Sequence, residues 1–163
     1  MVGDLILDQY VLGSVERVSP EAPIQVLAVR EEQFRLGGAA NVAQNAAAAG
    51  ARVSLVAAAG RDPDGARLRV MLGAIGVDDA GLIATKRPTT SKTRVVARAQ
   101  QMLRFDEEDD GDLPGRDVQR LLDTLLPLVA TAQAVVLEDY NKGVLVPAVI
   151  TAAIDAARSR GIP

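Results

Sequence analysis

The sequence of 163 residues contains no cysteine, no histidine and no tryptophan, and aromatic residues make up only 2% of it. Without cysteine the chain has neither a disulfide framework nor a thiolate site, which fits a cytoplasmic location. Without histidine it cannot hold a Ser-His-Asp triad or an imidazole-bound metal, so any acid–base chemistry must come from carboxylates, lysine or tyrosine. The scarcity of aromatic residues predicts a core of aliphatic side chains and alanine.

Long apolar runs and an excess of positive charge are also absent. No apolar run approaches the roughly 18 residues needed to cross a bilayer, and the first residues lack the basic and apolar regions of a signal peptide. The net charge of −3 and the pI of about 5.0 argue against a nucleic-acid surface or a basic membrane-binding face. The length is sufficient for one domain with a real core, or for part of a larger one.

Apolar and helical patterns alternate along the chain and predict an α/β fold. Near-continuous apolar runs are typical of buried parallel strands, and Asp62 followed by Pro63 is typical of a helix start. The predicted elements are strands at 52–57 and 134–137, helices that begin near 63 and 147, and an amphipathic helix that contains residues 121–129. This alternation predicts a parallel sheet flanked by helices. The sheet is expected to be incomplete at both ends of the chain.

Two polar segments with strand-like alternation differ from these buried strands and are predicted to be hairpins. The first, at about 12–36, is predicted to turn at 30–32, and the second occupies about 89–106. Both are expected to lie at the ligand edge of the sheet, where Asp4 and Asp8 also stand.

Three cations of the second hairpin are separated by even numbers of residues: Lys92, Arg94 and Arg98. Alternate residues of a strand face the same side, so these cations are expected to line one face. Two interpretations stay open. The charges either form a solvated edge that discourages aggregation, or they bind an anion.

Gly37 and Gly38 stand directly before an alanine-rich segment that is predicted to be a helix ending at Gly50. Glycine has no Cβ, so a ligand can approach the backbone closely there, and the first N–H groups of a helix attract anions. Asn41 adds an amide that both donates and accepts hydrogen bonds. The alternative is a small-residue helix packed tightly on a sheet. On the binding interpretation, a branched side chain at Gly38 blocks the ligand and leaves the fold intact.

Five stretches together resemble the ribokinase-like (PfkB) carbohydrate kinases, and most closely the bacterial D-glycero-β-D-manno-heptose 7-phosphate kinases. The stretches are Val2-Gly3-Asp4 with Leu7-Asp8, Val18-Ser19-Pro20-Glu21-Ala22-Pro23, Leu36-Gly37-Gly38-Ala39-Ala40-Asn41-Val42-Ala43, Lys92-Thr93-Arg94-Val95 and Asp139-Tyr140-Asn141-Lys142-Gly143. Such kinases occur alone or as the first domain of a bifunctional ADP-heptose synthesis protein. The resemblance implies that residues 1–163 are the N-terminal part of one ribokinase-like kinase domain, about its first half, with the two hairpins as its lid.

Site residues follow from the positions that match this family. The resemblance implies sugar-hydroxyl contacts for five residues: Asp8, Gly37, Gly38, Asn41 and Asp139. Lys92 and Arg94 are the first choices for the phosphate of the substrate, because charge-assisted contacts to phosphate are strong. The weaker candidates are Asp4, Arg98, Arg104 and Lys142.

The resemblance also implies a reaction, in which a phosphoryl group passes from MgATP to the anomeric hydroxyl of the heptose 7-phosphate, on the route to ADP-heptose for the lipopolysaccharide core. ATP and Mg²⁺ are the implied cofactors, and a homodimer through the lid is the implied assembly. The family's Gly-Ala-Gly-Asp segment, whose aspartate is the catalytic base, does not occur in these residues. We therefore expect no catalytic residue and no metal ligand here, and no turnover of ATP by these residues alone.

Two other hypotheses stay open. The chain can belong to a kinase of the same superfamily that acts on another sugar or on a nucleoside, which a comparison of phosphorylated and unphosphorylated sugars would reveal. It can also be a binding or dimerisation module without catalysis. A coding sequence that continues into a Gly-Ala-Gly-Asp segment counts against this last hypothesis.

Overall fold

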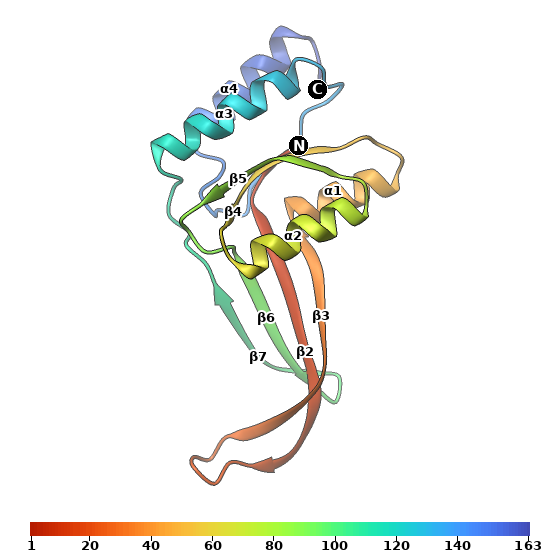
Figure 1. Ribbon diagram of the computed structural model, residues 1–163, viewed down its shortest axis with the longest axis vertical. Helices are drawn as coiled ribbons and strands as arrows, with labels where there is room; N and C mark the ends of the chain where they lie inside the picture. The colour runs from red at the N-terminus through yellow and green to blue at the C-terminus, as the bar shows by residue number, and fades with distance from the viewer.

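The computed structural model describes all residues from Met1 to Pro163 and contains two four-stranded sheets (Figure 1). The body sheet has the order β5-β4-β1-β8, and all its paired strands are parallel. The second sheet, which we call the lid, has the order β3-β2-β6-β7 and extends away from the helices (Figure 1). In the lid β2 and β6 are parallel, whereas β2–β3 and β6–β7 are antiparallel.

The bounds of the elements are as follows. The strands are β1 (Val2–Gly3), β2 (Leu5–Val18), β3 (Gln25–Gly38), β4 (Ser54–Gly60), β5 (Asp78–Thr85), β6 (Ser91–Ala97), β7 (Gln100–Glu107) and β8 (Leu137–Glu138). The helices are α1 (Ala39–Ala48), α2 (Pro63–Ala74), α3 (Gly115–Val129) and α4 (Pro147–Ser159). No helix is both long and apolar enough to cross a membrane.

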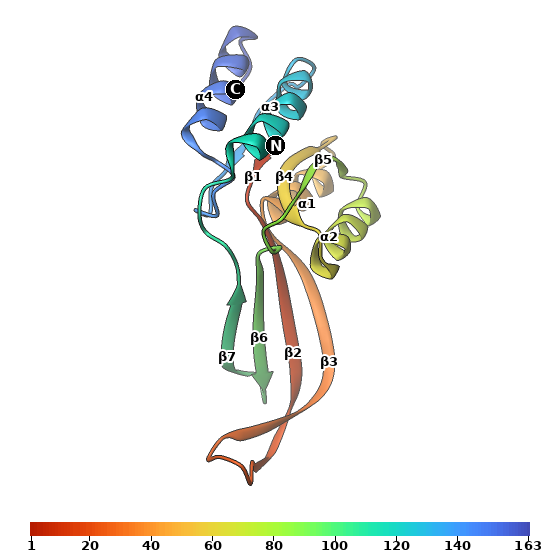
Figure 2. The same cartoon turned by 60° about the vertical axis from the view of Figure 1, so that its left-hand side comes forward.

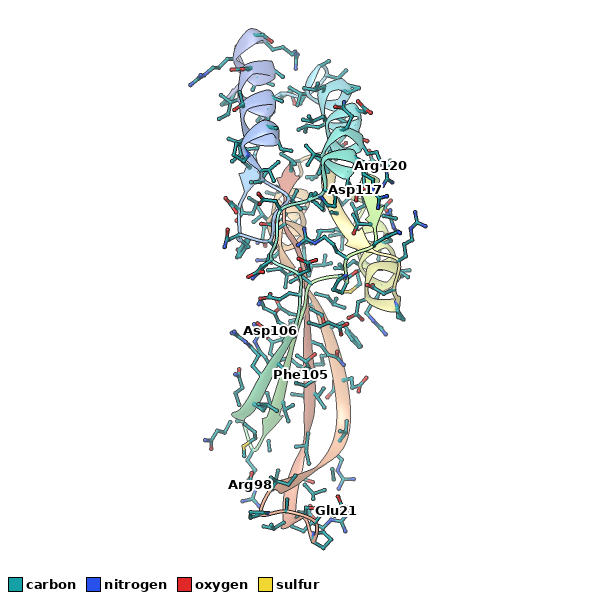
Figure 3. The ribbon with its side chains drawn as sticks, turned by 90° about the vertical axis from the view of Figure 1, so that its left-hand side faces the viewer. Glu21, Arg98, Phe105, Asp106, Asp117 and Arg120 are labelled. Atoms are coloured by element: carbon teal, nitrogen blue, oxygen red, sulfur yellow. The ribbon has the colours of Figure 1, made fainter.

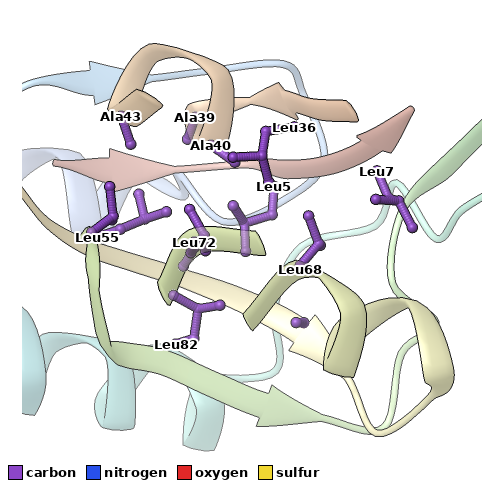
Figure 4. Packing of buried hydrophobic residues seen from close by; sticks show 13 residues of the cluster. Leu5, Leu7, Leu36, Ala39, Ala40, Ala43, Leu55, Leu68, Leu72 and Leu82 are labelled. Carbon is purple, nitrogen blue, oxygen red and sulfur yellow. The ribbon is translucent and has the colours of Figure 1, made fainter. Parts of the chain in front are cut away.

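Helices cover both faces of the body sheet, with α1 and α2 on one face and α3 and α4 on the other (Figure 2). On the first face Leu68 and Leu72 of α2 pack with Leu55 of β4 in a cluster of leucines and alanines (Figure 4). On the second face Leu121 of α3 and Val149 of α4 are fully buried in a separate cluster. These two layers confirm the predicted α/β fold with a parallel sheet flanked by helices, and its aliphatic core.

The start of α2 follows the local sequence pattern. The Asp62 carboxylate accepts hydrogen bonds from the Gly65 N–H (2.8 Å), the Thr89 N–H (2.8 Å) and the Thr89 hydroxyl (2.7 Å). Burial acts to raise the pKa of Asp62, but these hydrogen bonds outweigh it and hold the pKa below its usual value. Asp62 therefore both caps α2 and ties it to the segment that leads into β6.

One strand of the body, β5, was not predicted from the sequence. It begins with two aspartates and contains Gly81, and these residue types are not typical of a strand. Gly81 is needed because a Cβ there would lie 2.5 Å from the carbonyl oxygen of Leu55 on the neighbouring strand.

The first hairpin of the lid differs from its prediction. The expected turn at 30–32 is wrong, because β3 runs through these residues without a break and pairs with β2 along its length. The chain turns instead at 19–24, where the Ser19 N–H donates to the Ile24 carbonyl oxygen (2.8 Å). This turn contains two prolines, which cannot donate to a strand ladder, while the charged residues at 30–32 are tolerated because β3 is an edge strand. The hairpin therefore spans 5–38 instead of 12–36.

Asp4 is the only residue between β1 of the body and β2 of the lid, and it is fully buried. Its carboxylate accepts hydrogen bonds from the backbone N–H groups of Tyr140 (2.8 Å), Lys142 (3.1 Å) and Val144 (3.1 Å). Its own carbonyl oxygen accepts from the Ala39 N–H at the start of α1 (2.9 Å). One residue thus joins both sheets, α1 and the segment after β8.

Gly38 ends β3 directly before α1, as predicted for a helix start, and it has φ 56° and ψ −137°. Only glycine adopts this combination readily. A Cβ at Gly38 would also lie 2.4 Å from the carbonyl oxygen of Asp4. The expectation that a branched side chain at Gly38 leaves the fold intact is therefore wrong, because the backbone itself needs glycine there.

The first prediction concerns Asp4. We expect Asp4→Ala to lower the free energy of unfolding by at least about 3 kcal/mol, because it leaves three buried N–H groups without a partner and each such loss costs about 1–3 kcal/mol. Urea denaturation followed by circular dichroism measures it. Asp110→Ala removes an exposed acid and should change stability by no more than about 0.5 kcal/mol. Equal stability of the two variants would contradict the structural role of Asp4.

The second prediction compares two glycines with positive φ. Gly38→Ala is expected to destabilise the protein clearly more than Gly76→Ala, because a Cβ at Gly76 (φ 71°) meets no atom within 4 Å. The Gly76 variant carries only the backbone strain, about 1–2 kcal/mol. Midpoints of thermal unfolding decide it, and an equal loss in both variants would show that crowding by Asp4 is unimportant.

Candidate functional site

One face of the lid gathers most of the polar candidates, and we call it the polar face. In register, Asp8 on β2 lies between Arg35 on β3 and Lys92 on β6, while Tyr10 lies beside Arg94. Directly paired residues point to the same side of a sheet. The members of the polar face are Asp8, Tyr10, Arg35, Lys92, Arg94, Arg104 and Asp106.

The polar face points away from α2. Phe34, on the opposite side of β3, packs against the core cluster that contains α2, and the guanidinium carbon of Arg67 lies 3.6 Å from its ring centroid. The polar face instead reaches the segment after β8 through Glu108 and Lys142, whose Oε1 and Nζ atoms are 3.0 Å apart. The lid residues and the segment that carries Asp139 therefore border the same side of the molecule.

Asp8 and Arg94, two of the predicted site residues, form an ion pair with 2.5 Å between Nη1 and Oδ1. This hydrogen bond raises the pKa of Arg94 above its ordinary value. It is the one hydrogen bond that the Asp8 carboxylate accepts, so Oδ2 is available as an acceptor. A Cβ at Gly37 would lie 2.5 Å from that Oδ2, so the absence of a side chain at Gly37 leaves space for the carboxylate.

Lys92 belongs to a second ion cluster. Its Nζ lies 2.7 Å from Asp106 Oδ2 and 3.3 Å from Glu108 Oε2, and Arg104 Nε lies 3.0 Å from Asp106 Oδ1. Burial acts to lower the pKa of Lys92, but its hydrogen bonds to both carboxylates outweigh it and leave the pKa raised. Hydrogen bonds from Lys92 lower the pKa of Asp106, and those from Lys142 and then Lys92 lower the pKa of Glu108.

Asn41 and Asp139 lie apart from these ion clusters, at the carboxyl edge of the body sheet. Asn41 is exposed in the first turn of α1, and Asp139 is exposed directly after β8, where its Oδ1 accepts from the Asn141 N–H (2.7 Å). The carboxyl edge of a parallel sheet is where α/β folds bind ligands. The lid adjoins this edge, because β2 leaves it through Asp4.

Two candidates from the sequence do not fit the site. Asp4 is buried and its carboxylate is already hydrogen-bonded to three N–H groups, so it is not available to a sugar. Arg98 lies in the β6–β7 turn at the far end of the lid (Figure 3) and donates to the Val15 carbonyl oxygen (3.3 Å). The expected common face of Lys92, Arg94 and Arg98 fails because β6 ends at Ala97 and a bulge interrupts its pairing with β7 between Val95 and Val96.

Four residues of this region were not among the sequence candidates. Asp106 and Glu108 pair with Lys92, and their signal was the acidic stretch at the end of the second hairpin. Arg35 and Tyr10 lie on the polar face, where the Arg35 guanidinium carbon is 4.5 Å from the Tyr10 ring centroid. The misplaced turn at 30–32 concealed the pairing of Arg35 with Asp8.

A cavity of about 1090 Å³ lies at the opposite, amino edge of the body sheet, where Met1, Ser54 and Val136 line it. It is remote from the polar face and is not the candidate site. No three or more acidic side chains gather in a way that could hold a metal ion.

Two curated relatives resemble the chain over its whole length. The bifunctional protein HldE of Caulobacter vibrioides is 47% identical over 164 residues, an alignment that covers 100% of this chain and 33% of that protein. HldE of Citrifermentans bemidjiense is 44% identical, with coverage of 100% and 34%. The chain therefore spans about a third of the length of these relatives.

Solved structures share the fold, and a family model matches almost every residue. A carbohydrate kinase from Agrobacterium tumefaciens superposes with a TM-score of 0.73 at 21% identity, covering 99% of this chain and 50% of that one. Phosphofructokinase-2 from Escherichia coli, in complex with substrates and products, gives 0.69 at 20% identity, with coverage of 99% and 52%. The model of the pfkB family carbohydrate kinases matches residues 2–163. The chain belongs to the pfkB family of carbohydrate kinases.

Proposed function

We propose that this chain is the sugar-recognition part of an ATP-dependent kinase that phosphorylates D-glycero-D-manno-heptose 7-phosphate at its anomeric hydroxyl. The observation that carries the proposal is the polar face of the lid. There the Asp8 carboxylate keeps a free acceptor oxygen for a hydroxyl, beside the cations Arg94 and Lys92. A sugar phosphate offers both hydroxyls and an anion. The sequence resemblance to heptose 7-phosphate kinases supports this sugar and its use in ADP-heptose synthesis.

The proposed contacts to sugar hydroxyls use carboxylate and amide side chains that are at least partly exposed. Asp8 Oδ2 accepts a hydrogen bond from a sugar hydroxyl, and exposed Asn41 and Asp139 hold further hydroxyls. Gly37 and Gly38 are buried and act on the sugar site indirectly: Gly37 leaves space for the Asp8 carboxylate, and Gly38 allows the turn into α1. Lys92 and Arg94 bind the 7-phosphate, which takes over part of the hydrogen bonding that Asp106, Glu108 and Asp8 now receive.

MgATP, when bound, supplies the phosphoryl group, and such transfer depends mainly on positioning and charge neutralisation. We assign to this chain the positioning of the sugar and neither the catalytic base nor the nucleotide site. The 163 residues alone are therefore expected to release no ADP. We propose that the kinase acts in the cytoplasm, where ATP is available.

The third prediction tests the lid cations in the full-length protein. Lys92→Ala and Arg94→Ala are each expected to raise the KM for heptose 7-phosphate roughly ten- to a hundredfold, because a lost charge-assisted contact costs about 1.5–3 kcal/mol. The KM for ATP should stay the same, as measured by ADP release. Lys86→Ala, which removes an exposed lysine outside the lid, is the matched control.

Three results would count against this proposal. An unchanged KM for the sugar in both lid variants returns Lys92 and Arg94 to the role of a solvated edge. A higher kcat/KM of the unaltered protein for an unphosphorylated sugar or a nucleoside favours a different kinase of the family. Absence of any turnover with a panel of such substrates favours a binding or dimerisation module.

We also propose that the lid forms the contact of a homodimer. The face opposite to the polar face, which we call the apolar face, carries Val11, Val95, Leu103 and Phe105. Leu103 and Phe105 on β7 are 57% and 54% exposed (Figure 3 locates Phe105). Val18, Ile24 and Val29 elsewhere on the lid are more than half exposed as well. Apolar exposure on this scale is typical of an interaction surface.

The fourth prediction is that the double variant Leu103→Asp/Phe105→Asp is a monomer under conditions where the unaltered protein is a dimer. Two carboxylates on the apolar face would be buried without partners in the interface. Sedimentation velocity measures the change. Val70→Asp, at a 73% exposed position on α2, is the control and should leave the dimer intact. A dimer that survives the double variant, or an unaltered protein that is monomeric at high concentration, contradicts the lid contact.

A further inference from the structure

Arg35 differs from the other cations of the polar face because no carboxylate pairs with it. Lys92, Arg94 and Arg104 each form an ion pair with Asp8, Asp106 or Glu108. Arg35 donates only to the neutral side-chain oxygen of Gln33 (3.2 Å). No carboxylate therefore forms an ion pair with its guanidinium group, although Asp8 lies on the neighbouring strand.

Tyr10 holds this unpaired guanidinium in place. The guanidinium carbons of Arg35 and Arg94 lie 4.5 Å and 5.3 Å from the centroid of the Tyr10 ring. An arginine over an aromatic face is attracted by the ring and keeps the edge of its planar group free for hydrogen bonds. Two guanidinium groups thus share one ring, and both belong to residues beside Asp8 on the polar face.

The charges around this ring favour an anion. Arg35 and Arg94 carry two positive charges and Asp8 carries one negative charge, so the group has a net charge of about +1. Arg94 Nη1 is already committed to Asp8, so a new anion at Arg94 has to compete with that carboxylate. At Arg35 no such competition exists. A phosphate monoester carries about −1.5 to −2 charges at pH 7 and accepts paired N–H bonds from arginine.

We propose that Arg35, stacked on Tyr10, binds the phosphate monoester of the sugar substrate together with Arg94. The inference rests on the proposed function and adds to it the residue that selects a phosphorylated sugar over an unphosphorylated one. Asp8 then holds a hydroxyl of the same sugar through Oδ2, while Tyr10 acts as a positioning residue for both arginines.

The test measures ADP release by the full-length protein with heptose 7-phosphate and with the unphosphorylated heptose. Arg35→Gln is expected to raise the KM for heptose 7-phosphate roughly ten- to a hundredfold. It should leave the KM for ATP and the kcat/KM for the unphosphorylated heptose unchanged. Arg35→Lys keeps the charge but loses the planar group, so its KM should lie between those of Arg35→Gln and the unaltered protein. Tyr10→Leu is expected to behave like Arg35→Gln: the KM for heptose 7-phosphate rises, and the kcat/KM for the unphosphorylated heptose stays the same.

Arg30→Gln is the matched control, because Arg30 is an exposed arginine on the same strand outside the polar face, and it should keep the unaltered KM. An unaltered KM for heptose 7-phosphate in Arg35→Gln overturns the assignment of Arg35. An equal loss with the phosphorylated and the unphosphorylated sugar also overturns it, since that pattern belongs to a structural role. Circular dichroism of each variant shows whether it folds. If Arg35→Gln is misfolded, the KM of Arg35→Lys is the deciding measurement.

A separate experiment applies if the proposed substrate is wrong. If the unaltered protein does not use heptose 7-phosphate, isothermal titration with fructose 6-phosphate and with fructose tests whether Arg35 binds a sugar phosphate, independently of the heptose. Tighter binding of the phosphorylated sugar that is lost in Arg35→Gln supports the anion site. Equal binding of the two sugars, or no binding of either, overturns it.

Discussion

The buried carboxylate of Asp4 is the interaction on which the geometry of the site depends. It accepts hydrogen bonds from three backbone N–H groups of the segment after β8. The N–H of the same residue donates to the Glu138 carbonyl oxygen, and its carbonyl oxygen accepts from the Ala39 N–H. Hydrogen bonds to a charged acceptor are the strong ones, and here they converge where β1 passes into the lid. The carboxylate of Asp4 therefore fixes the segment after β8, and the backbone carbonyl of the same residue fixes the start of α1.

The lid cations are held by carboxylates before any substrate arrives. Glu108 connects Lys92 on the lid with Lys142 after β8, and Asp8 fixes Arg94. Such pairs fix long side chains in one geometry, which reduces the entropy lost when a ligand binds. They also lower the net positive charge that an incoming phosphate meets. The ion pairs therefore orient the lid cations at the expense of some attraction for the phosphate. Arg35, which has no carboxylate partner, supplies positive charge beside them.

Features encoded by neighbouring residues could be predicted from the sequence, and features made by distant ones could not. The cap at Asp62 and the helix start after Gly38 depend on local patterns, and the structure has both. The site residues Asp8 and Arg94 came from a family resemblance, and no pattern showed that they pair across 86 residues of sequence. Asp4 was misassigned for the same reason, because its partners lie 136 to 140 residues away. The turn at 30–32 failed because charge alone does not distinguish a turn from an edge strand.

The central place of β1 has a consequence for the order of events on the ribosome. Val2 pairs with Val56 on one side and with Leu137 on the other, and Asp4 has its carboxylate partners only once Val144 has been made. At about 5–20 residues per second, synthesis of the roughly 140 intervening residues takes about 7–28 s. During that interval the first strand has one neighbour at most, and Asp4 stays hydrated. The β8 side of the body sheet and the hydrogen bonds of the Asp4 carboxylate therefore form only after about 140 further residues have been made.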